Sequence, residues 1–230
     1  MRVKCGGSVI ESKKAVKYLS ITVDQKMNFI EHATLVHNKV SKTLRQLWHI
    51  LPNMGGARES KRHLLVNVAM AQLLYGAPCW EADMGQSGWR KIEPLHRRIA
   101  ILKVCAYRSV SYAAVAVVAG MPPIRLLAKE RAELYDGLVR EGIRRKLMEN
   151  WQRSWNEDLK GRWTHRLIPK IDILVNRRHG EVGHWLCQFL TGHGSFGVYL
   201  VKWRRRSFDK CQLCGITPDT IEHVVYNCDA

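Results

Sequence analysis

Three cysteines and a histidine near the end of the sequence have the spacing of a metal site. Cys211 and Cys214 form a C-x2-C pair; eight residues separate Cys214 from His223, and four separate His223 from Cys228. Two thiolates on one tight turn can bind one side of a metal ion, and a histidine and a cysteine at helical spacing can bind the other. Gly215 suits the sharp turn that such a cysteine pair needs. The pattern predicts a tetrahedral Cys3His site for a structural Zn2+ ion.

The alternative interpretation is that these residues are unrelated core thiols and a surface histidine. Four candidate ligands within the eighteen residues 211–228 favour the zinc site over this alternative. A closed four-ligand site has no open position for a substrate, so its expected role is to fold a tail too small to bury its own core. Zinc knuckles of this kind also recur in proteins that bind single-stranded RNA.

The charge of the chain points to a polyanionic partner. Lysine and arginine number 37 against 20 aspartate and glutamate, a formal net charge of +17. A basic cluster around one tryptophan runs directly into the cysteine pair, and it can supply phosphate contacts and a stacking platform. The alternative is a solvated linker in a basic protein. The residues predicted to bind nucleic acid are Lys202, Trp203, Arg204, Arg205, Arg206, Arg162, Arg177 and Arg178.

The other aromatic and histidine residues give weaker signals. Tryptophans on apolar stripes are expected in the core, namely Trp48, Trp80, Trp89 and Trp185. Three more alternate with arginine and lysine and either stack bases or pack between helices, namely Trp151, Trp155 and Trp163. Of the lone histidines, His193 between two glycines is the best candidate for a substitute ligand or for a group supporting the metal site.

Motifs for catalysis are missing from the chain. Two-metal nucleotidyl transfer needs paired carboxylates that hold Mg2+, and there is no Tyr-x-Asp-Asp sequence. Glu157 and Asp158 lie in a polar helical stretch and are a poor candidate pair. The sequence also lacks a P-loop, a G-x-S-x-G elbow and an H-E-x-x-H motif. We expect no polymerase or nuclease activity from these residues alone, and no small-molecule substrate.

Hydrophobic periodicity predicts a mainly helical protein. The run 16–23 is rich in β-branched and aromatic residues and reads as one strand, with a short strand before it. Apolar residues then recur at three- and four-residue steps, and proline and glycine separate the segments. The expected helices are 29–50, 64–75, 89–103, 111–119 with Gly120 as its C-cap, and one long helix over 124–151.

Cysteine usage and hydropathy restrict the setting of the chain. Seven cysteines, an odd number, with no apolar signal segment at the N-terminus do not resemble a disulfide framework, so we expect a reducing compartment. No apolar run is long enough to span a bilayer, so we expect no membrane partner.

Four segments together resemble one protein family. They are VKYLSITVDQKMNF (16–29), LLYGAPCW (73–80), GRWTHRLIP (161–169) with the run 177–200, and CQLCGITPDTIEHVVYNC (211–228). The chain resembles the C-terminal part of the Pol polyprotein of insect type-1 (R1-like) non-LTR retrotransposons. The last two segments are the most specific, and the resemblance covers nearly the whole chain. Ser20 departs from the family, which has glycine there, and this indicates a degenerate copy.

The resemblance implies a parent RNA-directed DNA polymerase (a reverse transcriptase) with an endonuclease, which nicks chromosomal DNA and primes reverse transcription at the nick. Its carboxylates and Mg2+ would lie outside this chain, which we expect to be a fragment. Only Cys211, Cys214, His223 and Cys228 carry over as functional positions. The implied partners are RNA, DNA and the rest of the polyprotein. The implied location is intracellular, with a nuclear target and a cytoplasmic ribonucleoprotein stage.

The expected fold is therefore mainly α, with a short N-terminal β segment, a helical thumb and connector, and a C-terminal CCHC zinc knuckle. The expected divisions are the palm–thumb junction (1–28), the thumb and connector (29–150), a basic Trp-rich segment (151–206) and the knuckle (207–230). The expected function is to grip template RNA or target DNA during target-primed reverse transcription. The alternative is a non-catalytic, zinc-stapled structural or protein-interaction module.

Overall fold

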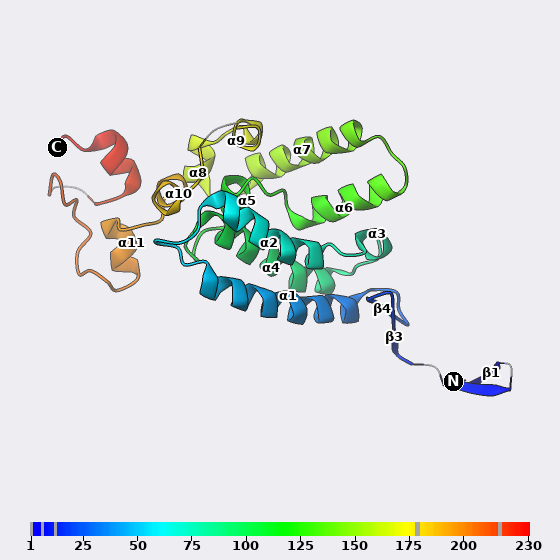
Figure 1. Ribbon diagram of the computed structural model, residues 1–230. Helices are drawn as coiled ribbons and strands as arrows, with labels where there is room; N and C mark the ends of the chain where they lie inside the picture. The colour runs from blue at the N-terminus through cyan, green and yellow to red at the C-terminus, as the bar shows by residue number, and fades with distance from the viewer. Residues whose placement is uncertain (1, 6, 12, 178–179, 216–217) are drawn as a thin grey trace.

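A computed structural model describes residues 2–5, 7–11, 13–177, 180–215 and 218–230. The protein is mainly helical, with a short N-terminal β segment and a C-terminal Cys3His cluster, as the sequence predicted (Figure 1). Two antiparallel hairpins come first, β1 (Arg2–Cys5) with β2 (Ser8–Glu11) and β3 (Ala15–Tyr18) with β4 (Ile21–Asp24). The helices that follow are α1 (Ile30–Ile50), α2 (Glu59–Leu73), α3 (Ala77–Trp80), α4 (Gln86–Val104), α5 (Tyr112–Val118), α6 (Ile124–Tyr135), α7 (Arg140–Glu157), α8 (Arg162–Leu167), α9 (Ile171–Val175), α10 (His184–Thr191), α11 (Gly197–Lys202) and the π-helical turn η1 (His223–Asn227).

The segment predicted as one strand over 16–23 is a hairpin, so that prediction was wrong. Leu19 and Ser20 have φ of 43° and 68° and form a two-residue turn between β3 and β4. Positive φ at both central residues matches the right-handed twist of the flanking strands. The Tyr75 hydroxyl donates a hydrogen bond to the Leu19 carbonyl at 3.0 Å, which joins this turn to the helical part.

Helices α1, α2 and α4 form the centre of the core. The three- and four-residue period of α1 places Val36, Val40 and Leu44 on its buried face, against α2 and α4. Trp80 and Trp89 lie within this core, as predicted, with ring centroids 5.8 Å apart. The amphipathic pattern of α1 was therefore a sufficient guide to which face of that helix is buried.

A buried arginine joins the ends of two core helices. Arg62 on α2 is 1% exposed and donates hydrogen bonds to the carbonyls of Leu51 (3.3 Å) and Leu102 (3.0 Å), near the C-terminal ends of α1 and α4. It also donates to the carbonyls of Ala57 at 2.7 Å and Pro52. The cation thus satisfies carbonyls that helix ends leave unpaired and faces the negative ends of two helix dipoles.

The long helix predicted over 124–151 is two helices. Helix α6 ends at Tyr135, and Gly137 has φ of +83° in the turn before α7 begins. The two helices pack as an antiparallel pair (Figure 1). Gly120 has φ of +59° and follows α5 as the predicted cap. A single glycine in a polar stretch can end a helix, and periodicity alone did not show this.

The tryptophans of the C-terminal half separate into core and surface. Trp151 and Trp155 are 2% and 1% exposed and belong to the core, and the Trp155 indole donates to the Ile168 carbonyl at 2.9 Å. Trp185 on α10 was expected in the core but is 70% exposed, so that prediction was wrong. Its helix is short, and Cys187 and Thr191 occupy its buried face instead. Every helix in the described residues is too short or too polar to span a bilayer.

Candidate metal centre

The first half of the candidate metal centre is a tight loop that carries Cys211 and Cys214. The Gly215 amide donates a hydrogen bond to the Cys211 carbonyl at 2.9 Å, and Gly215 has φ of +73°. A left-handed residue after the second cysteine closes the turn, as the sequence predicted. Lys210 and Pro218 form a β-bridge across its base. The loop therefore presents both thiols on one side.

The second half is the turn η1, which carries His223 at its start and Cys228 directly after it. The Thr220 hydroxyl accepts a hydrogen bond from the His223 amide at 3.0 Å, in the manner of an N-cap. A π-helical turn closes over five residues, so it brings positions i and i+5 to the same side. The His223–Cys228 separation thus matches a π turn, whereas the sequence suggested ordinary helical spacing.

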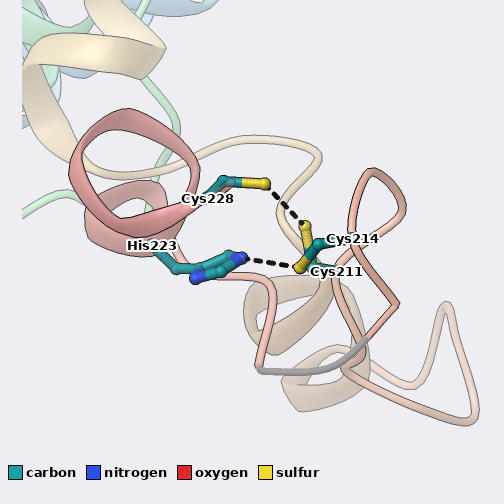
Figure 2. A group of neighbouring side chains, drawn as sticks. All are labelled: Cys211, Cys214, His223 and Cys228. Atoms are coloured by element: carbon teal, nitrogen blue, oxygen red, sulfur yellow. Dashed lines mark hydrogen bonds between the residues drawn. The ribbon is translucent and has the colours of Figure 1, made fainter. Parts of the chain in front are cut away.

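The four side chains converge from these two segments (Figure 2). Their ligand atoms all lie within 4.8 Å of one another, with Cys211 Sγ 3.9 Å from Cys228 Sγ and Cys214 Sγ 3.2 Å from His223 Nε2. Zn–S and Zn–N bonds of about 2.3 and 2.0 Å place tetrahedral ligand atoms about 3.5–3.8 Å apart. A disulfide would need about 2.05 Å between sulfurs. The donor set and its size fit a metal ion such as zinc.

Burial and charge at the cluster also suit a closed site. Cys211 and His223 are 3% and 9% exposed, while Cys214 and Cys228 are half-buried. A hydrogen bond from the Ala230 backbone lowers the pKa of the Cys228 thiol, but burial and the neighbouring thiols outweigh it, and the net shift is upward. The Cys228 thiol therefore resists ionisation until a cation stabilises its thiolate, so metal binding here would release its proton.

Asp219 connects the cluster to α11. Its carboxylate accepts a hydrogen bond from the Gly197 amide at 2.8 Å, and its carbonyl accepts one from the Val198 amide at 3.2 Å. The same carboxylate lies 3.7 Å from the guanidinium of Arg206. Asp219 is 6% exposed. The sequence showed an acidic residue near the ligands but gave no indication of this contact, because Gly197 is distant in the chain.

The cluster also packs on α8. Arg166 forms an ion pair with Glu222, and its guanidinium lies 5.0 Å from the ring centroid of Tyr226. The Trp163 and Tyr226 rings are 6.1 Å apart, edge to face. Trp163 therefore contacts protein aromatics on this side, and its indole donates to the Phe189 carbonyl at 2.8 Å. These side-chain contacts join the tail to α8, in addition to the backbone hydrogen bond between Asp219 and Val198.

The structure divides the predicted nucleic-acid residues into two groups. Lys202, Trp203, Arg204 and Arg205 are exposed around the end of α11, and Trp203 and Arg205 line the same cavity. The guanidiniums of the other described members contact protein groups. Arg206 faces Asp219 and stacks on Phe208; Arg177 pairs with Glu59; Arg162 donates to the Trp155, Asn156 and Asp158 carbonyls at the end of α7. Arg178 lies outside the described residues.

The glycine-rich segment before α11 is neither a dinucleotide-binding loop nor part of the metal cluster among the described residues. Its residues Gly192, Gly194 and Gly197 have the spacing G-x-G-x-x-G, but they follow helix α10, whereas a dinucleotide fingerprint follows a strand. His193, the candidate substitute ligand, is not a member of the cluster among the described residues. Its Nδ1 hydrogen-bonds the Thr191 carbonyl at 2.7 Å, and its ring contacts Tyr199. It helps to hold this turn.

Comparison with known proteins gives a consistent set of relatives. No family model and no solved structure matches the chain. The chain is 28% identical over 241 residues to a retrovirus-related Pol polyprotein from type-1 retrotransposable element R1 2 of Nasonia vitripennis, covering 92% of this chain and 58% of the relative. It is 29% identical over 254 residues to a putative 115 kDa protein in type-1 retrotransposable element R1DM of Drosophila melanogaster, covering 98% and 25%.

A third relative, a Pol polyprotein from the R1 element of Bradysia coprophila, is 26% identical over 98% of this chain and 25% of its own length. The chain thus spans between 25% and 58% of the length of these three relatives. The matches extend through the helical part as well as the cysteine cluster, because they cover nearly the whole chain. The chain is homologous to the Pol polyproteins of insect type-1 R1 non-LTR retrotransposons, at 26–29% identity.

Proposed function

We propose that this chain is a nucleic-acid-binding C-terminal part of a retrotransposon RNA-directed DNA polymerase polyprotein. It grips template RNA or target DNA during target-primed reverse transcription, and a structural Zn2+ ion on Cys211, Cys214, His223 and Cys228 folds its tail. The single observation that carries the proposal is the Cys3His cluster placed directly beside an exposed basic segment. The polymerase and endonuclease chemistry, with its Mg2+, belongs to other parts of the polyprotein.

The role of the metal follows from the packing of the tail. Among the described residues of the tail (207–230), the buried apolar side chains are Cys211 and Ile221, and neither belongs to the main core. A bound ion supplies the folding free energy that such a short segment cannot gain by burial. Asp219 then transmits this order to α11, whose end carries the basic segment. Loss of zinc should therefore disorder the segment that contacts nucleic acid.

The charges of the basic segment are available to a ligand. In the described residues, Lys202, Arg204 and Arg205 are exposed and none of them forms an ion pair. Phosphate contacts by such residues release counterions, so affinity falls with rising salt. The chain has 37 lysines and arginines against 20 aspartates and glutamates, so its acidic groups cannot neutralise all of its cations.

The test is fluorescence anisotropy with labelled RNA and DNA over a range of salt concentrations. Lys202→Ala/Arg204→Ala/Arg205→Ala should reduce the slope of log affinity against log salt by about 2–3, since each phosphate contact contributes about 0.7–0.9. The control is Arg140→Ala/Arg145→Ala/Arg153→Ala, three exposed arginines on α7. Equal effects of the two triple variants, or binding that ignores salt, would contradict the proposal. Magnesium-dependent primer extension by the purified chain would contradict the proposal that the polymerase chemistry belongs to other parts of the polyprotein.

A second candidate is a zinc-stapled protein-interaction module. The observation that favours it is a set of apolar side chains on α1 and α2 that are more than half exposed: Leu35, Ile50, Leu64 and Val68. Where such side chains form one continuous apolar patch, they mark contact with another protein, and the partner here would be the rest of the polyprotein. This candidate would be favoured if the chain bound another fragment of the polyprotein equally well at low and high salt and did not bind nucleic acid. The divisions at residues 28, 150 and 206 remain predictions.

A further inference from the structure

A groove lined by aromatic and arginine side chains lies between α11 and the loops that follow α1 and α4. It consists of Trp48, Tyr107, Arg108, Tyr199, Trp203 and Arg205, and we call it the arginine–aromatic groove. Its cavity has a volume of about 510 Å³. A second cavity of about 420 Å³ shares Trp48 and Arg108 with it and adds Arg45 and Arg98. Cavities of 300–1,000 Å³ accommodate small ligands, so each can take part of a polymer.

Two buried or half-buried arginines hold the loops that form this groove. Arg62 holds the loop after α1 through the Pro52 and Ala57 carbonyls. Arg97 holds the loop after α4 by donating to the Val110 carbonyl at 3.1 Å and to the Arg108 carbonyl. Backbone held by charge-assisted hydrogen bonds keeps a fixed position without a ligand. The groove is therefore a preformed feature of the core rather than a gap between mobile segments.

Three aromatic rings of the groove are neighbours, with Tyr199 next to both Tyr107 and Trp203. The ring centroids of Tyr107 and Tyr199 are 6.1 Å apart, and those of Tyr199 and Trp203 are 6.3 Å apart. The Tyr199 and Ser109 hydroxyls are hydrogen-bonded to each other, which fixes Tyr199 against the α4 loop. Trp203 is 55% exposed at the groove's edge. Successive aromatic faces of this kind are what single-strand-binding proteins use to stack bases.

Uncompensated positive charge surrounds these rings. Arg45, Arg98, Arg108 and Arg205 are exposed, and within the described part of the chain none of them forms an ion pair. Neither cavity has an acidic side chain among its described lining residues. The Arg108 guanidinium lies 4.6 Å from the Trp48 ring centroid, so the ring holds that cation without neutralising it. The charge is complementary to phosphates, and the rings are complementary to bases.

We propose that the arginine–aromatic groove binds an unpaired segment of nucleic acid, with bases against Tyr107, Tyr199 and Trp203 and phosphates on the surrounding arginines. The proposal rests on the proposed function and places the main single-strand contact on the helical core rather than on the zinc tail alone. Paired bases cannot reach the rings, because their faces are covered in a duplex. The groove thus makes the chain prefer single strands, which the tail charges by themselves do not.

The test compares matched variants on single-stranded and duplex probes. The probes are labelled oligo(U), oligo(dT) and a duplex, each about 15 nucleotides long, near the upper site size of known single-strand modules. Trp203→Ala is paired with Trp185→Ala, an exposed tryptophan outside the groove. Arg45→Ala/Arg98→Ala is paired with Arg140→Ala/Arg145→Ala. Circular dichroism and zinc content confirm that each variant is folded.

The wild-type chain should bind the single strands at least 5-fold more tightly than the duplex. Trp203→Ala should weaken single-strand binding about 5- to 150-fold, the effect of losing one stacked base, while Trp185→Ala leaves it unchanged. Arg45→Ala/Arg98→Ala should reduce the single-strand salt slope by about 1.4, more than its control does. The RNA and DNA arms show which sugar the groove prefers.

The contrary outcomes separate the two proposals. If the wild-type chain binds but the groove variants match their controls, the groove proposal is wrong and the basic tail remains the contact. If polyglutamate displaces the probes at the same concentration as unlabelled oligo(U), the groove recognises negative charge alone and the proposal also fails. If the wild-type chain binds no nucleic acid at all, the proposed function itself is overturned.

Discussion

Arg177 and Glu59 form an ion pair that joins the end of α9 to the start of α2, 118 residues apart in sequence. Arg177 Nη2 lies 3.0 and 2.8 Å from the two carboxylate oxygens, and Glu59 Oε2 also accepts a hydrogen bond from the Val182 amide at 2.5 Å. The side chains are 26% and 11% exposed. Arg177 was predicted from the sequence to bind nucleic acid, and that prediction is untested; because of this ion pair, we now predict that its charge stabilises the fold.

The expected cost of removing this pair follows from its burial. Breaking a fully buried pair costs about 3–5 kcal/mol, because it leaves a buried charge without a partner. Since Arg177 is a quarter exposed, solvent screening reduces the cost, and we expect about 2 kcal/mol for Arg177→Ala. In a chain of this size that lowers the melting temperature by about 4–8 °C. Glu59→Gln in the same background should restore part of the loss, with a coupling of about 1 kcal/mol or more.

The assay is a double-mutant cycle on thermal and urea unfolding, followed by tryptophan fluorescence with zinc in excess. Anisotropy measured below the transition supplies the second readout. Arg177→Ala should leave the nucleic-acid affinity of the folded chain within about 2-fold of wild type and should not change its salt slope. A coupling below about 0.5 kcal/mol would refute the structural role. So would a slope reduced by about 0.7–0.9, the value of one phosphate contact.

Three further predictions concern the turn, the core and the tail. Ser20→Gly should raise the free energy of unfolding by about 0.5–1 kcal/mol, because Ser20 has φ of +68°, and an unchanged melting temperature would count against a native two-residue turn. Burial lowers the pKa of His96 to about 3, whereas the unfolded chain protonates near pH 6.5, so stability falls as pH drops below about 6.5. Between pH 7 and 5, the free energy of unfolding of His96→Asn should therefore fall by about 2 kcal/mol less than that of the wild type, as measured by urea titrations at each pH. Equal pH dependence of the two free energies would contradict the burial of His96. Asp219→Ala should speed hydrogen exchange of the Gly197–Lys202 amides while zinc stoichiometry stays at the wild-type value, and unchanged exchange would show that Asp219 does not anchor α11.

Features set by near neighbours could be predicted from the sequence. The ligands Cys211, Cys214, His223 and Cys228 lie in one short window, and the structure brings all four together. The buried face of α1 follows from its own periodicity. The hairpin at Leu19 was missed because β-branched residues on both sides gave one continuous strand signal, and neither turn residue is a glycine.

Features set by distant partners could not be predicted. Arg62 is buried because two helix ends converge on it, and Arg177 is occupied because Glu59 lies beside it. The arginine–aromatic groove draws Trp48, Tyr107 and Trp203 from separate segments, so no local pattern marks it. Trp185 looked apolar in its local context but lies on the outer face of a short helix. These cases depend on which elements meet, and spacing within one element carries no information about that.

The central claim is that Zn2+ on the Cys3His cluster folds the tail that grips nucleic acid. Its most direct test is native mass spectrometry of the purified chain beside Cys211→Ser/Cys214→Ser, with oligo(U) binding measured on the same samples. We predict one zinc ion per wild-type chain, none in the variant, and weaker, less salt-sensitive binding by the variant. A wild-type chain that holds no zinc would contradict the central claim. If the wild-type chain holds zinc but the zinc-free variant binds oligo(U) equally well, the metal has only a structural role and does not support nucleic-acid binding.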